Sequence, residues 1–298
     1  MSVRLKIARA GPLTTIQDGG RQGLLAHGIS ASGPMDRRAF GQAGLLCGGQ
    51  GAGIEMTQAG LDLVLAEGSV RVGWAGGAFN VRRNGRAGAW PGMAVLKAGD
   101  RLSITPGPEG NYAYLRFAAT LDLPLVLGSQ ATNMRAGIGG LGGRALMAGD
   151  MLVLTGAAGA PQSAPATTSE TGPIRFIRGL HWDRFSPSVQ AHFCSAQFRV
   201  TSMMDRMGVR LADPERVFES ASILSLVSDP VLPGDIQILG DGTPIVLMRD
   251  HQPTGGYPRI GTIISADLDR FAQLRPGRTL AFVPVSVEHA QRLLRSGP

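Results

Sequence analysis

Glycine and proline limit what this chain can fold into more than any other residue types. Of its 298 residues, 43 are glycine and 19 are proline, and neither recurs at a fixed period. Such a density interrupts helices and favours short strands joined by tight turns. Apolar and polar residues alternate over residues 61–65 and 70–74, which is the period of a half-buried strand. The sequence therefore predicts a mainly-β fold with few helices.

Three stretches share a glycine turn that leads directly into a strand-like run. They are residues 98–104, 148–154 and, more loosely, 276–282. Asn84-Gly85 adds a hairpin signal, because both residues tolerate the positive φ that a two-residue turn requires. We interpret these stretches as architecture and not as parts of a site.

Four short helices are predicted from capping residues that precede apolar residues at helical spacing. Ser32 is expected to cap the first helix, which Pro34 helps to start and which ends near Gly48. Ser186, followed by Pro187, is expected to cap the second. Ser265 and Ser286 are expected to cap the other two, whose inward-facing residues are Leu268, Phe271 and Ala272 in one helix and Ala290, Leu293 and Leu294 in the other.

The composition changes in the middle of the chain. From residue 155 to residue 172 the sequence is rich in alanine, serine, threonine, proline and glycine and has no periodicity, which is typical of a linker or a long exposed loop. We therefore predict a β-rich N-terminal half over residues 1–155, a linker or exposed loop over residues 156–172, and a β-rich C-terminal half over residues 173–298.

Charge and cysteine content argue against several classes of protein. The formal net charge is +7, yet the basic residues are dispersed arginines, with Lys6 and Lys97 the only lysines. This distribution does not predict nucleic-acid binding and better suits carboxylate or phosphate recognition by the guanidinium fork. No stretch approaches the ~20 apolar residues of a membrane span. Cys47 and Cys194 stand in no metal or redox spacing, which fits a reducing cytoplasm.

Several well-known motifs are absent from the sequence. It contains no Gly-x-x-x-x-Gly-Lys-Ser/Thr phosphate loop and no His-Glu-x-x-His metal motif. Its five histidines are scattered without ligand spacing, so no metal site is predicted.

One turn combines an unusual number of polar functional groups. Residues 250–258 read Asp-His-Gln-Pro-Thr-Gly-Gly-Tyr-Pro and lie between two strand-like runs. Glycine and proline alone would suffice for a turn. Here the turn also carries five polar groups: a carboxylate, an imidazole, a carboxamide, a hydroxyl and a phenol, from Asp250, His251, Gln252, Thr254 and Tyr257. Two interpretations stay open: a rigid turn with incidental polar residues, or the rim of a binding site that a ligand approaches at Gly255 and Gly256.

A glycine-rich loop covers residues 135–144, which read Arg-Ala-Gly-Ile-Gly-Gly-Leu-Gly-Gly-Arg. The loop formally satisfies G-x-G-x-x-G, but no helix follows and no acidic residue stands ~20 positions later, so a dinucleotide site is not predicted. Two alternatives stay open. Successive backbone N–H groups hold an anion between Arg135 and Arg144, or the glycines are bends at a barrel corner.

Five motifs, in one order, resemble those of the biotin-dependent carboxyltransferase family, also called allophanate hydrolase subunit 2. They are Gln17-Asp18-Gly19-Gly20-Arg21, Ser32-Gly33-Pro34-Met35-Asp36, the loop of residues 135–144, Asp205-Arg206-Met207-Gly208 with Arg210-Leu211, and the turn of residues 250–258. The resemblance covers nearly the whole chain. It implies a cyclophilin-like β-barrel architecture with a few short peripheral helices.

The chain departs from the family pattern in four places. It lacks an asparagine-rich stretch after the first predicted helix, has Val209 in place of a tyrosine, and has no glutamate in residues 225–229. Arg259 stands where relatives often carry lysine. Because arginine cannot act as a base, we expect Arg259 to keep an anion-binding role and to lose any role in proton transfer.

The resemblance implies an enzyme subunit that acts on a small amide or urea-like substrate. The function expected from it is that of an ATP-dependent 5-oxoprolinase-type hydrolase, which opens 5-oxoproline to glutamate in a hetero-oligomer with a KipI or B-type partner subunit. One alternative is a carboxyltransferase that receives carboxylate from carboxybiotin on another protein, since this chain has no Met-Lys-Met attachment sequence. The other alternative is a KipA-like regulatory binding protein. We expect a cytoplasmic protein with no covalently bound cofactor, ATP being used by the complex.

The resemblance also suggests which residues form the site. Asp18, Asp36 and Asp250 are the candidates for the catalytic base. The expected substrate-binding residues are Gln17, Arg21, Ser32, Arg135, Gly139, Gly140, Arg144, Arg206, Gln252, Thr254, Gly255, Gly256 and Tyr257. We expect the turn of residues 250–258 and the loop of residues 135–144 to face one pocket, the turn pairing with an amide and the loop supplying positive charge. Asp250→Asn and Arg135→Ala are then expected to lose activity without losing stability.

Overall fold

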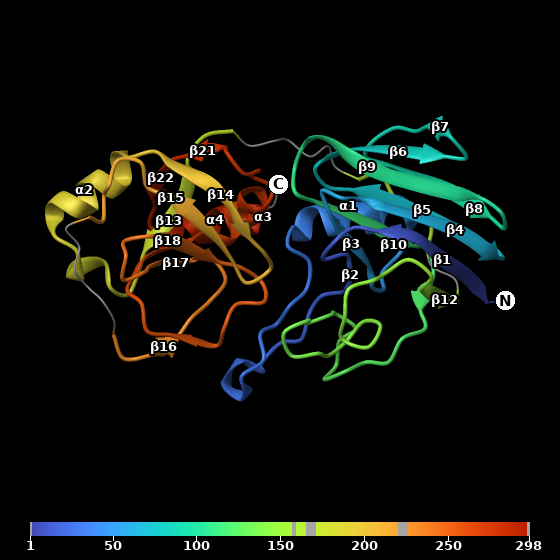
Figure 1. Cartoon of the computed structure of the whole chain (residues 1–298), viewed down its shortest axis with the longest axis horizontal. Coiled ribbons are helices and arrows are strands. Elements are labelled where there is room, and N and C mark those ends of the chain that lie inside the picture. The colour runs from blue at the N-terminus through green and yellow to red at the C-terminus, as the bar shows by residue number, and fades with distance from the viewer. Residues whose placement is uncertain (1, 157–158, 165–170, 220–225, 297–298) are drawn as a thin grey trace. The chain divides into compact units, whose positions relative to one another are not determined.

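The computed structural model describes residues 2–156, 159–164, 171–219 and 226–296 (Figure 1). Within it the chain forms two compact units. The first unit comprises Met1–Gln22 and Ala31–Ala166, and the second comprises Gly23–Ser30 and Thr167–Pro298. Of the loop predicted over residues 156–172, residues 157–158 and 165–170 lie outside the described residues. The grouping of residues 23–30 with the second unit was not predicted, because no local pattern in the sequence signals it.

The first unit is built from two antiparallel sheets around an apolar core. The sheets have the orders β11-β12-β1-β4-β9-β6-β7 and β2-β3-β10-β5-β8. The alternation over residues 61–65 is confirmed in β4, where Leu61, Leu63 and Leu65 are buried in the core. The strands are β1 (Val3–Ala10), β2 (Thr15–Gln17), β3 (Gly53–Thr57), β4 (Leu61–Glu67), β5 (Ser69–Ala75), β6 (Ala78–Arg83), β7 (Arg86–Ala87), β8 (Gly92–Lys97), β9 (Arg101–Glu109), β10 (Tyr112–Phe117), β11 (Thr120–Leu121) and β12 (Met151–Thr155).

The second unit contains an eight-stranded sheet, β21-β14-β15-β18-β17-β20-β13-β22, and the two-stranded sheet β16-β19. All its pairs are antiparallel except β13 with β22. The strands are β13 (Ile174–Arg178), β14 (Phe198–Met204), β15 (Gly208–Ala212), β16 (Asp229–Pro230), β17 (Asp235–Ile238), β18 (Pro244–Leu247), β19 (Thr254–Gly255), β20 (Arg259–Ile263), β21 (Thr279–Leu280) and β22 (Phe282–Pro284).

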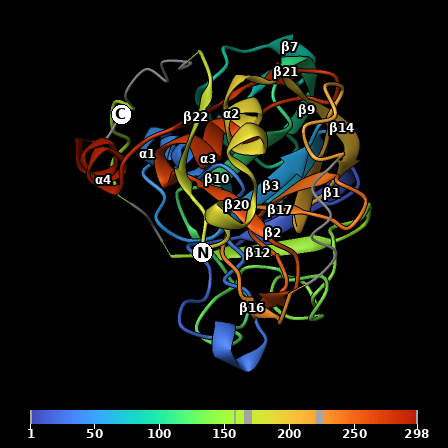
Figure 2. The same cartoon turned by 90° about the vertical axis from the view of Figure 1, so that its left-hand side faces the viewer.

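Strands predominate over helices in the described residues, and the structure includes a nearly closed, barrel-like sheet. The predicted mainly-β, barrel-type architecture with a few short helices is therefore confirmed. Aromatic side chains fill the core of the second unit, where the Phe193 ring lies 5.3 Å from Phe176 and 5.1 Å from Phe282, measured between ring centroids. Phe193 comes from α2 (Pro187–Ser195), so this helix packs on β13 and β22 through that ring. Figure 2 shows α2 as the yellow helix in the upper middle of the view.

The prediction that Ser32 caps the first helix is wrong. Helix α1 (Arg37–Cys47) begins later, and its N-cap is Asp36, whose side chain accepts a hydrogen bond of 2.9 Å from the Ala39 N–H. Ser32 has φ +57°, whereas an N-cap residue normally has extended backbone. Gly48, with φ +71°, ends the helix as predicted.

Two of the other three caps are confirmed. Ser186 accepts a hydrogen bond from the Val189 N–H at the start of α2, and Ser286 accepts one from the His289 N–H at the start of α4 (Val287–Ser296). Ser265 is not a cap, because it already lies inside α3 (Ser265–Ala272) and Ile264 precedes the helix without a side-chain cap. The short 3₁₀ helices η1 (Leu25–His27) and η2 (Trp182–Arg184) complete the described helices.

The inward faces of the last two helices differ. Leu268, Phe271 and Ala272 of α3 are buried as predicted. The prediction holds only in part for α4, in which Ala290 and Leu293 are half-buried and Leu294 is 60% exposed. The spacing of apolar residues indicates which face of a helix is apolar, but it does not show whether another element covers that face. No helix among the described residues is long and apolar enough to cross a membrane.

The recurring glycine turns are confirmed as architecture. Gly99, Gly149 and Gly277 have φ of +90°, +97° and +87° and stand just before β9, β12 and β21. In the first two turns, Asp100 and Asp150 each accept a hydrogen bond from the N–H three residues earlier, at 2.8 and 2.9 Å. The Asn84-Gly85 hairpin is confirmed between β6 and β7, with φ of +50° and +81°.

Candidate active site

The polar turn of residues 250–258 lies in the second unit between β18 and β20. Its middle forms the strand β19, which pairs with β16 at Asp229 and Pro230. His251 is buried, and its Nδ1 lies 2.6 Å from the Gln252 carbonyl oxygen. Burial lowers the pKa of His251 below its ordinary value, against the opposing effects of the Gln252 carbonyl, Asp235 and Asp250. His251 is therefore an internal support of the turn.

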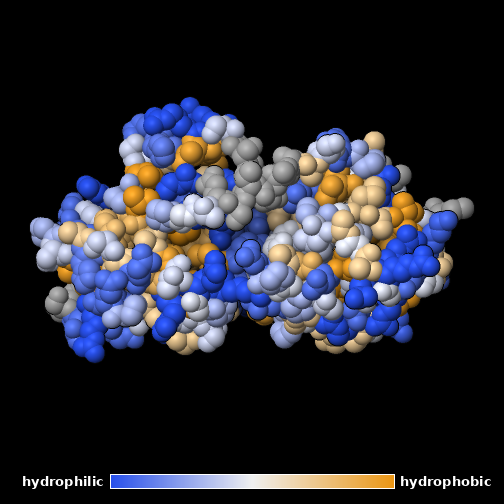
Figure 3. Space-filling view, turned by 90° about the horizontal axis from the view of Figure 1, so that it is seen from above, coloured by the Kyte–Doolittle hydropathy of each residue, from blue (hydrophilic) through white to orange (hydrophobic). Residues whose placement is uncertain are grey.

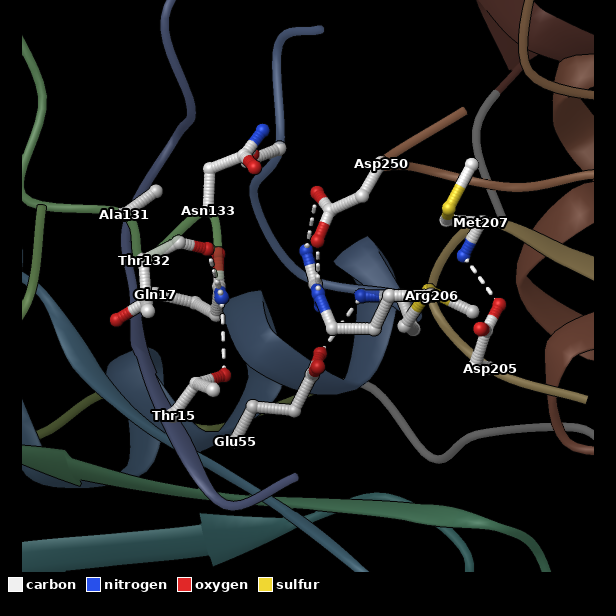
Figure 4. Close-up of polar contacts among 12 residues, drawn as sticks. Thr15, Gln17, Glu55, Ala131, Thr132, Asn133, Asp205, Arg206, Met207 and Asp250 are labelled. Atoms are coloured by element: carbon white, nitrogen blue, oxygen red, sulfur yellow. Dashed lines mark hydrogen bonds and ion pairs between the residues drawn. The ribbon is translucent and has the colours of Figure 1, made fainter. Parts of the chain in front are cut away.

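Asp250 is held in a buried ion pair with Arg206. The Arg206 Nε and Nη2 donate to the two Asp250 carboxylate oxygens at 2.8 and 3.1 Å, and the two side chains are 3% and 6% exposed (Figure 4). The Asp250 N–H also donates to the Arg206 carbonyl at 2.7 Å. Both carboxylate oxygens of Asp250 are thus occupied by the Arg206 guanidinium. The geometry therefore favours a positioning role for both residues, tying the polar turn to the segment between β14 and β15.

That segment carries the Asp205-Arg206-Met207-Gly208 motif. The Asp205 carboxylate accepts hydrogen bonds from the N–H groups of Met207 at 2.7 Å and Gly208 at 3.1 Å (Figure 4). This local turn explains why an acidic residue stands two positions before Met207. Asp205 thus shapes the hairpin and, together with the Arg206–Asp250 pair, fixes one wall of a cavity.

The cavity has a volume of about 570 Å³ and lies within the second unit. Its volume falls in the range typical of small-molecule sites, ~300–1,000 Å³. Two residues of the polar turn, Gln252 and Tyr257, contribute to its wall, whereas Asp250, Thr254, Gly255, Gly256 and Arg206 do not. The other lining residues are Ser202, Met203, Met204, Asp205, Met207, Gly208, Arg210, Gln237, Leu239, Ile245 and Leu247. The cavity thus combines an apolar wall rich in methionine with a small number of polar groups.

Gln237 is a cavity residue that the sequence analysis missed. It lies on β17, is 2% exposed, and accepts a hydrogen bond of 3.3 Å from the Gln252 side chain. The only available signal was a polar residue between Ile236 and Ile238, which by itself is uninformative. Gly255 lies against it: a Cβ atom at position 255 would overlap with Gln237 Nε2. Any larger residue at position 255 would have to displace the Gln237 carboxamide.

Arg259 does not have the free charge that an anion-binding role needs. Its guanidinium lies 3.4 Å from Asp235 and 3.8 Å from Asp229, and Nη1 donates to the Pro230 carbonyl at 3.0 Å. The backbone N–H of Arg259 donates to His181 Nδ1 at 3.1 Å. These acidic partners already neutralise the guanidinium, so the arrangement favours a structural role for Arg259 and runs against the anion-binding role expected from the sequence.

In the first unit, Gln17 bridges two elements from a fully buried position. Its Nε2 donates to the Thr15 hydroxyl at 2.9 Å and to the Thr132 carbonyl at 3.1 Å (Figure 4). Asp18 accepts hydrogen bonds from the Gly20 N–H, the Ser129 hydroxyl and the Gln130 N–H at 2.6–2.9 Å. Both side chains connect the Gln-Asp motif to residues 129–132, and these contacts favour an organising role.

Arg21 and Ser32 are also buried in the first unit. Arg21 Nη2 donates to the Ala131 carbonyl at 2.5 Å, and its Nε lies 3.4 Å from the Val126 carbonyl. Ser32 accepts a hydrogen bond of 3.2 Å from the Asn133 side chain. Asp36 is the N-cap of α1 described above. Arg21 and Ser32, like Gln17 and Asp18, thus contact the segment of residues 126–133 through its backbone or side chains.

Glu55 is a second residue that the sequence analysis missed. It is fully buried on β3, where one carboxylate oxygen accepts hydrogen bonds from the Met35 N–H at 2.7 Å and the Tyr114 hydroxyl at 2.9 Å. The Tyr114 hydroxyl also accepts a hydrogen bond from the Asp36 N–H at 2.7 Å. Burial, followed by the negative charges of Glu55 and Asp36, raises the pKa of Tyr114 well above its ordinary value. Tyr114 is therefore a neutral link between α1 and the core sheet.

The glycine-rich loop of residues 135–144 uses part of its backbone internally. The Ile138, Gly140 and Gly143 N–H groups donate to the carbonyl groups of Asn133, Gln130 and Gly139. Gly137, Gly139, Gly140, Gly142 and Gly143 all have positive φ, as bends require. Because the Gly140 N–H is engaged, it is not available for an anion nest, and the geometry favours the alternative that the glycines are bends.

The two arginines of this loop differ in their surroundings. Arg144 forms a bidentate ion pair with Asp150, with N–O distances of 2.8 and 2.7 Å. The hydrogen bonds to the Asp150 carboxylate raise the pKa of Arg144, and the same bonds from the Arg144 guanidinium lower the pKa of Asp150. Arg135 is exposed. Since these residues belong to the first unit and the polar turn belongs to the second, the expected common pocket stays a prediction.

Comparison with known proteins identifies the class of protein. The family model described as carboxyltransferase domain, subdomain A and B, matches residues 27–284. The chain therefore belongs to this family, and the resemblance carried by the five motifs is confirmed.

Individual proteins are similar to this chain over nearly its whole length. The 5-oxoprolinase C subunit of Escherichia coli (strain K12) is 36% identical over 295 residues, which cover 96% of this chain and 93% of that protein. The 5-oxoprolinase C subunit of Haemophilus influenzae is 32% identical over 289 residues, covering 94% and 91%. The crystal structure of the Kluyveromyces lactis urea carboxylase matches 98% of this chain and 28% of that chain, with a TM-score of 0.91 and 27% identity.

Proposed function

We propose that this chain is the C-type subunit of a cytoplasmic, ATP-dependent 5-oxoprolinase. In this reaction water opens the ring amide of 5-oxoproline to give glutamate, while ATP is hydrolysed to ADP and phosphate. The observation that carries the proposal is the near end-to-end match with two 5-oxoprolinase C subunits, whereas the chain corresponds to 28% of the urea carboxylase. The subunit acts in a hetero-oligomer with a KipI or B-type partner.

The chemistry of the cavity supports an amide substrate. Gln252 offers a donor and an acceptor, and Tyr257 offers a hydroxyl that does either. These groups match the N–H and C=O of an amide and stand against an apolar wall. The sequence contains no phosphate loop of the Gly-x-x-x-x-Gly-Lys-Ser/Thr type, so we derive no ATP-binding step on this chain and assign the nucleotide to the complex.

A second candidate function is favoured by the family model and by the urea carboxylase structure. In that case the chain is a carboxyltransferase that moves carboxylate from carboxybiotin on another protein to a urea-like acceptor. The cavity also fits this acceptor, because urea and amides present the same donor and acceptor groups.

The test is to assemble the chain with its B-type partner and the remaining 5-oxoprolinase subunit. We expect glutamate and ADP to form in equal amounts, only when 5-oxoproline, ATP and this chain are all present. A parallel assay supplies a biotin carboxylase, its biotin carrier, bicarbonate and urea. Carboxylation of urea without any opening of 5-oxoproline would replace the first proposal with the second. If ATP-dependent ring opening persists without this chain, it is not a required subunit.

A further inference from the structure

Two carboxamides meet at one end of the cavity in the second unit. Gln252 Nε2 donates to Gln237 Oε1 at 3.3 Å, and both residues line the cavity. They differ in their surroundings, because Gln237 lies on the strand β17, bonded to β18 and β20, whereas Gln252 lies in the turn. Gln237 is therefore the fixed member of the pair, and Gln252 is the member that it orients.

Gln237 is held at a cost in stability. Its Nε2 is buried and has no hydrogen-bond partner among the described residues, and an unsatisfied buried donor costs about 1–3 kcal/mol. Gly255 has no side chain to displace this carboxamide, since a Cβ atom there would overlap with Nε2. If the side chain at position 237 only filled space, an apolar side chain of the same shape would serve equally well. The retained carboxamide therefore points to a role in which its oxygen orients Gln252.

Gln252 presents one complete edge of its carboxamide to a ligand when Gln237 takes the Nε2 hydrogen that lies trans to Oε1. One Nε2 hydrogen is engaged by Gln237, while Oε1 and the second Nε2 hydrogen have no partner among the described residues. A primary carboxamide presents that acceptor and that donor side by side. A lactam has a cis amide, so its N–H and C=O also lie on one edge and can form two hydrogen bonds with Gln252 at once. An open-chain secondary amide is trans and can form only one of them.

A positively charged group stands on the same cavity. Arg210 lines it and forms no ion pair with the described residues. Its charge contributes to the lowered pKa of Asp241, although the hydrogen bonds of Asp241 to Thr243 matter more. Arginine binds carboxylates through two parallel N–H groups. Arg210 thus offers a partner for a carboxylate carried by a ligand whose amide is bound at Gln252.

We propose that this cavity recognises a small lactam that bears a carboxylate. Gln252 contacts the cis amide edge, Arg210 contacts the carboxylate, and Gln237 is a positioning residue that acts through Gln252. This inference rests on the proposed function, since it assigns the substrate class of that function to a particular cavity and adds two residues, Gln237 and Arg210, that family resemblance did not place in the site. The lactam fills only the end of the cavity near Gln252, and the methionine-rich wall lines the rest.

The experiment compares ligands and variants in the assembled complex without ATP, so that binding is measured in the absence of turnover. The ligands are 5-oxoproline, 2-pyrrolidinone, which lacks the carboxylate, and N-acetylglycine, which has a carboxylate and a trans amide. The variants are Gln252→Met, Gln237→Met and Arg210→Gln, with Gln190→Met as the control. Gln190 donates to the Trp182 and Phe185 carbonyl groups of the same unit and does not line the cavity.

The expected results are specific to each variant. Gln252→Met weakens 5-oxoproline binding by about 10-fold and abolishes its preference over N-acetylglycine, whereas Gln237→Met weakens binding by about 3- to 10-fold. Arg210→Gln weakens 5-oxoproline binding by about 10- to 100-fold and leaves 2-pyrrolidinone binding unchanged. The melting temperature of Gln237→Met does not fall, because the substitution removes an unpaired buried donor. Gln190→Met lowers the melting temperature and leaves the affinities unchanged.

Three outcomes would overturn the inference. In the first, the wild-type complex binds no lactam. In the second, it binds 5-oxoproline and N-acetylglycine equally well. In the third, the Gln237→Met variant loses stability but keeps the wild-type affinity. ATP-dependent ring opening is measured separately on the same wild-type complex. If that activity is absent while the selectivity for lactams holds, the proposed function fails and the cavity assignment stands. If ring opening occurs but the cavity variants bind normally, the cavity assignment fails and the proposed function stands.

Discussion

The polar residues of the motifs have different roles in the two units. In the first unit, Gln17 and Arg21 donate hydrogen bonds to backbone carbonyl groups, and Asp18 accepts one from the Gln130 N–H. In the second unit, the Arg206–Asp250 pair is likewise internal, but Gln252, Tyr257 and Arg210 face a cavity. A polar motif can therefore mark the framework of a site or its contact surface. Only the bonding partners distinguish the two cases.

The hydropathy of the exposed surface does not distinguish framework residues from contact residues. Polar and apolar residues are interspersed over the face shown in Figure 3, as expected for a chain whose arginines are dispersed. The comparison instead makes predictions about single residues. Framework residues should affect stability first, and contact residues should affect ligand binding at constant stability.

The largest effect is expected when the buried ion pair of the second unit is broken. Asp250→Ala leaves the Arg206 guanidinium without its bidentate partner, and removing one member of a buried pair costs about 3–5 kcal/mol. The free energy of unfolding, measured in urea, should therefore fall by about 3 kcal/mol. Asp250→Asn should also lower it, in contrast to the sequence-based expectation of unchanged stability. The double variant Arg206→Met, Asp250→Leu should recover part of the loss, and wild-type stability of Asp250→Ala would show that the pair is not a framework element.

A smaller loss is expected from Asp18→Ala in the first unit. The carboxylate accepts three hydrogen bonds from two loops, and leaving their donors unsatisfied should cost about 2 kcal/mol. Asp122→Ala, at an exposed carboxylate on the same unit, is the control and should change stability by less than about 0.5 kcal/mol. Equal effects of the two substitutions in urea unfolding would remove Asp18 from the framework and return it to the candidates for the catalytic base.

The sequence predicted local features better than the partners of the site residues. The glycine turns before β9, β12 and β21 are correct because a positive φ is a property of one residue. Arg206 and Asp250 were both named as site residues, but their pairing joins positions 44 residues apart, and no local pattern encodes that distance. Glu55 and Gln237 were missed for a related reason, since each is a polar residue inside a strand whose function depends on what packs against it.

The close approach at Gly255 gives a test of intermediate size. Gly255→Ala places a methyl group against the Gln237 carboxamide, and such overpacking costs about 1–3 kcal/mol. Gly41→Ala is the matched control, because it lies in α1 with open space around its Cα and should raise stability by about 0.5–1 kcal/mol. The difference between the two melting temperatures should vanish if Gly255 is free of Gln237, and in that case the proposed anchoring of Gln252 loses its structural basis.

The smallest effect concerns acid stability and the buried His181 beside the polar turn. Burial, then the Arg259 charge and more weakly Arg184, lower the pKa of His181, while Asp229 and Asp235 raise it. The net direction is downward from 6.5. As the pH falls below 6.5, the unfolded chain binds a proton that the folded His181 does not, so stability is lost as the pH falls from 6.5 toward the lower pKa of the folded state.

For one proton the slope of the free energy of unfolding is at most about 1.4 kcal/mol per pH unit. His181→Gln should reduce the slope below pH 6.5. The double variant with His251→Gln should reduce it further, because the pKa of His251 is lowered in the same direction, chiefly by burial. His27→Gln, at an exposed position, should leave the slope unchanged. The slopes come from urea titrations at several pH values. If all these variants have the same slope as the wild type, the acid sensitivity arises elsewhere in the protein. His181 and His251 would then not be its source.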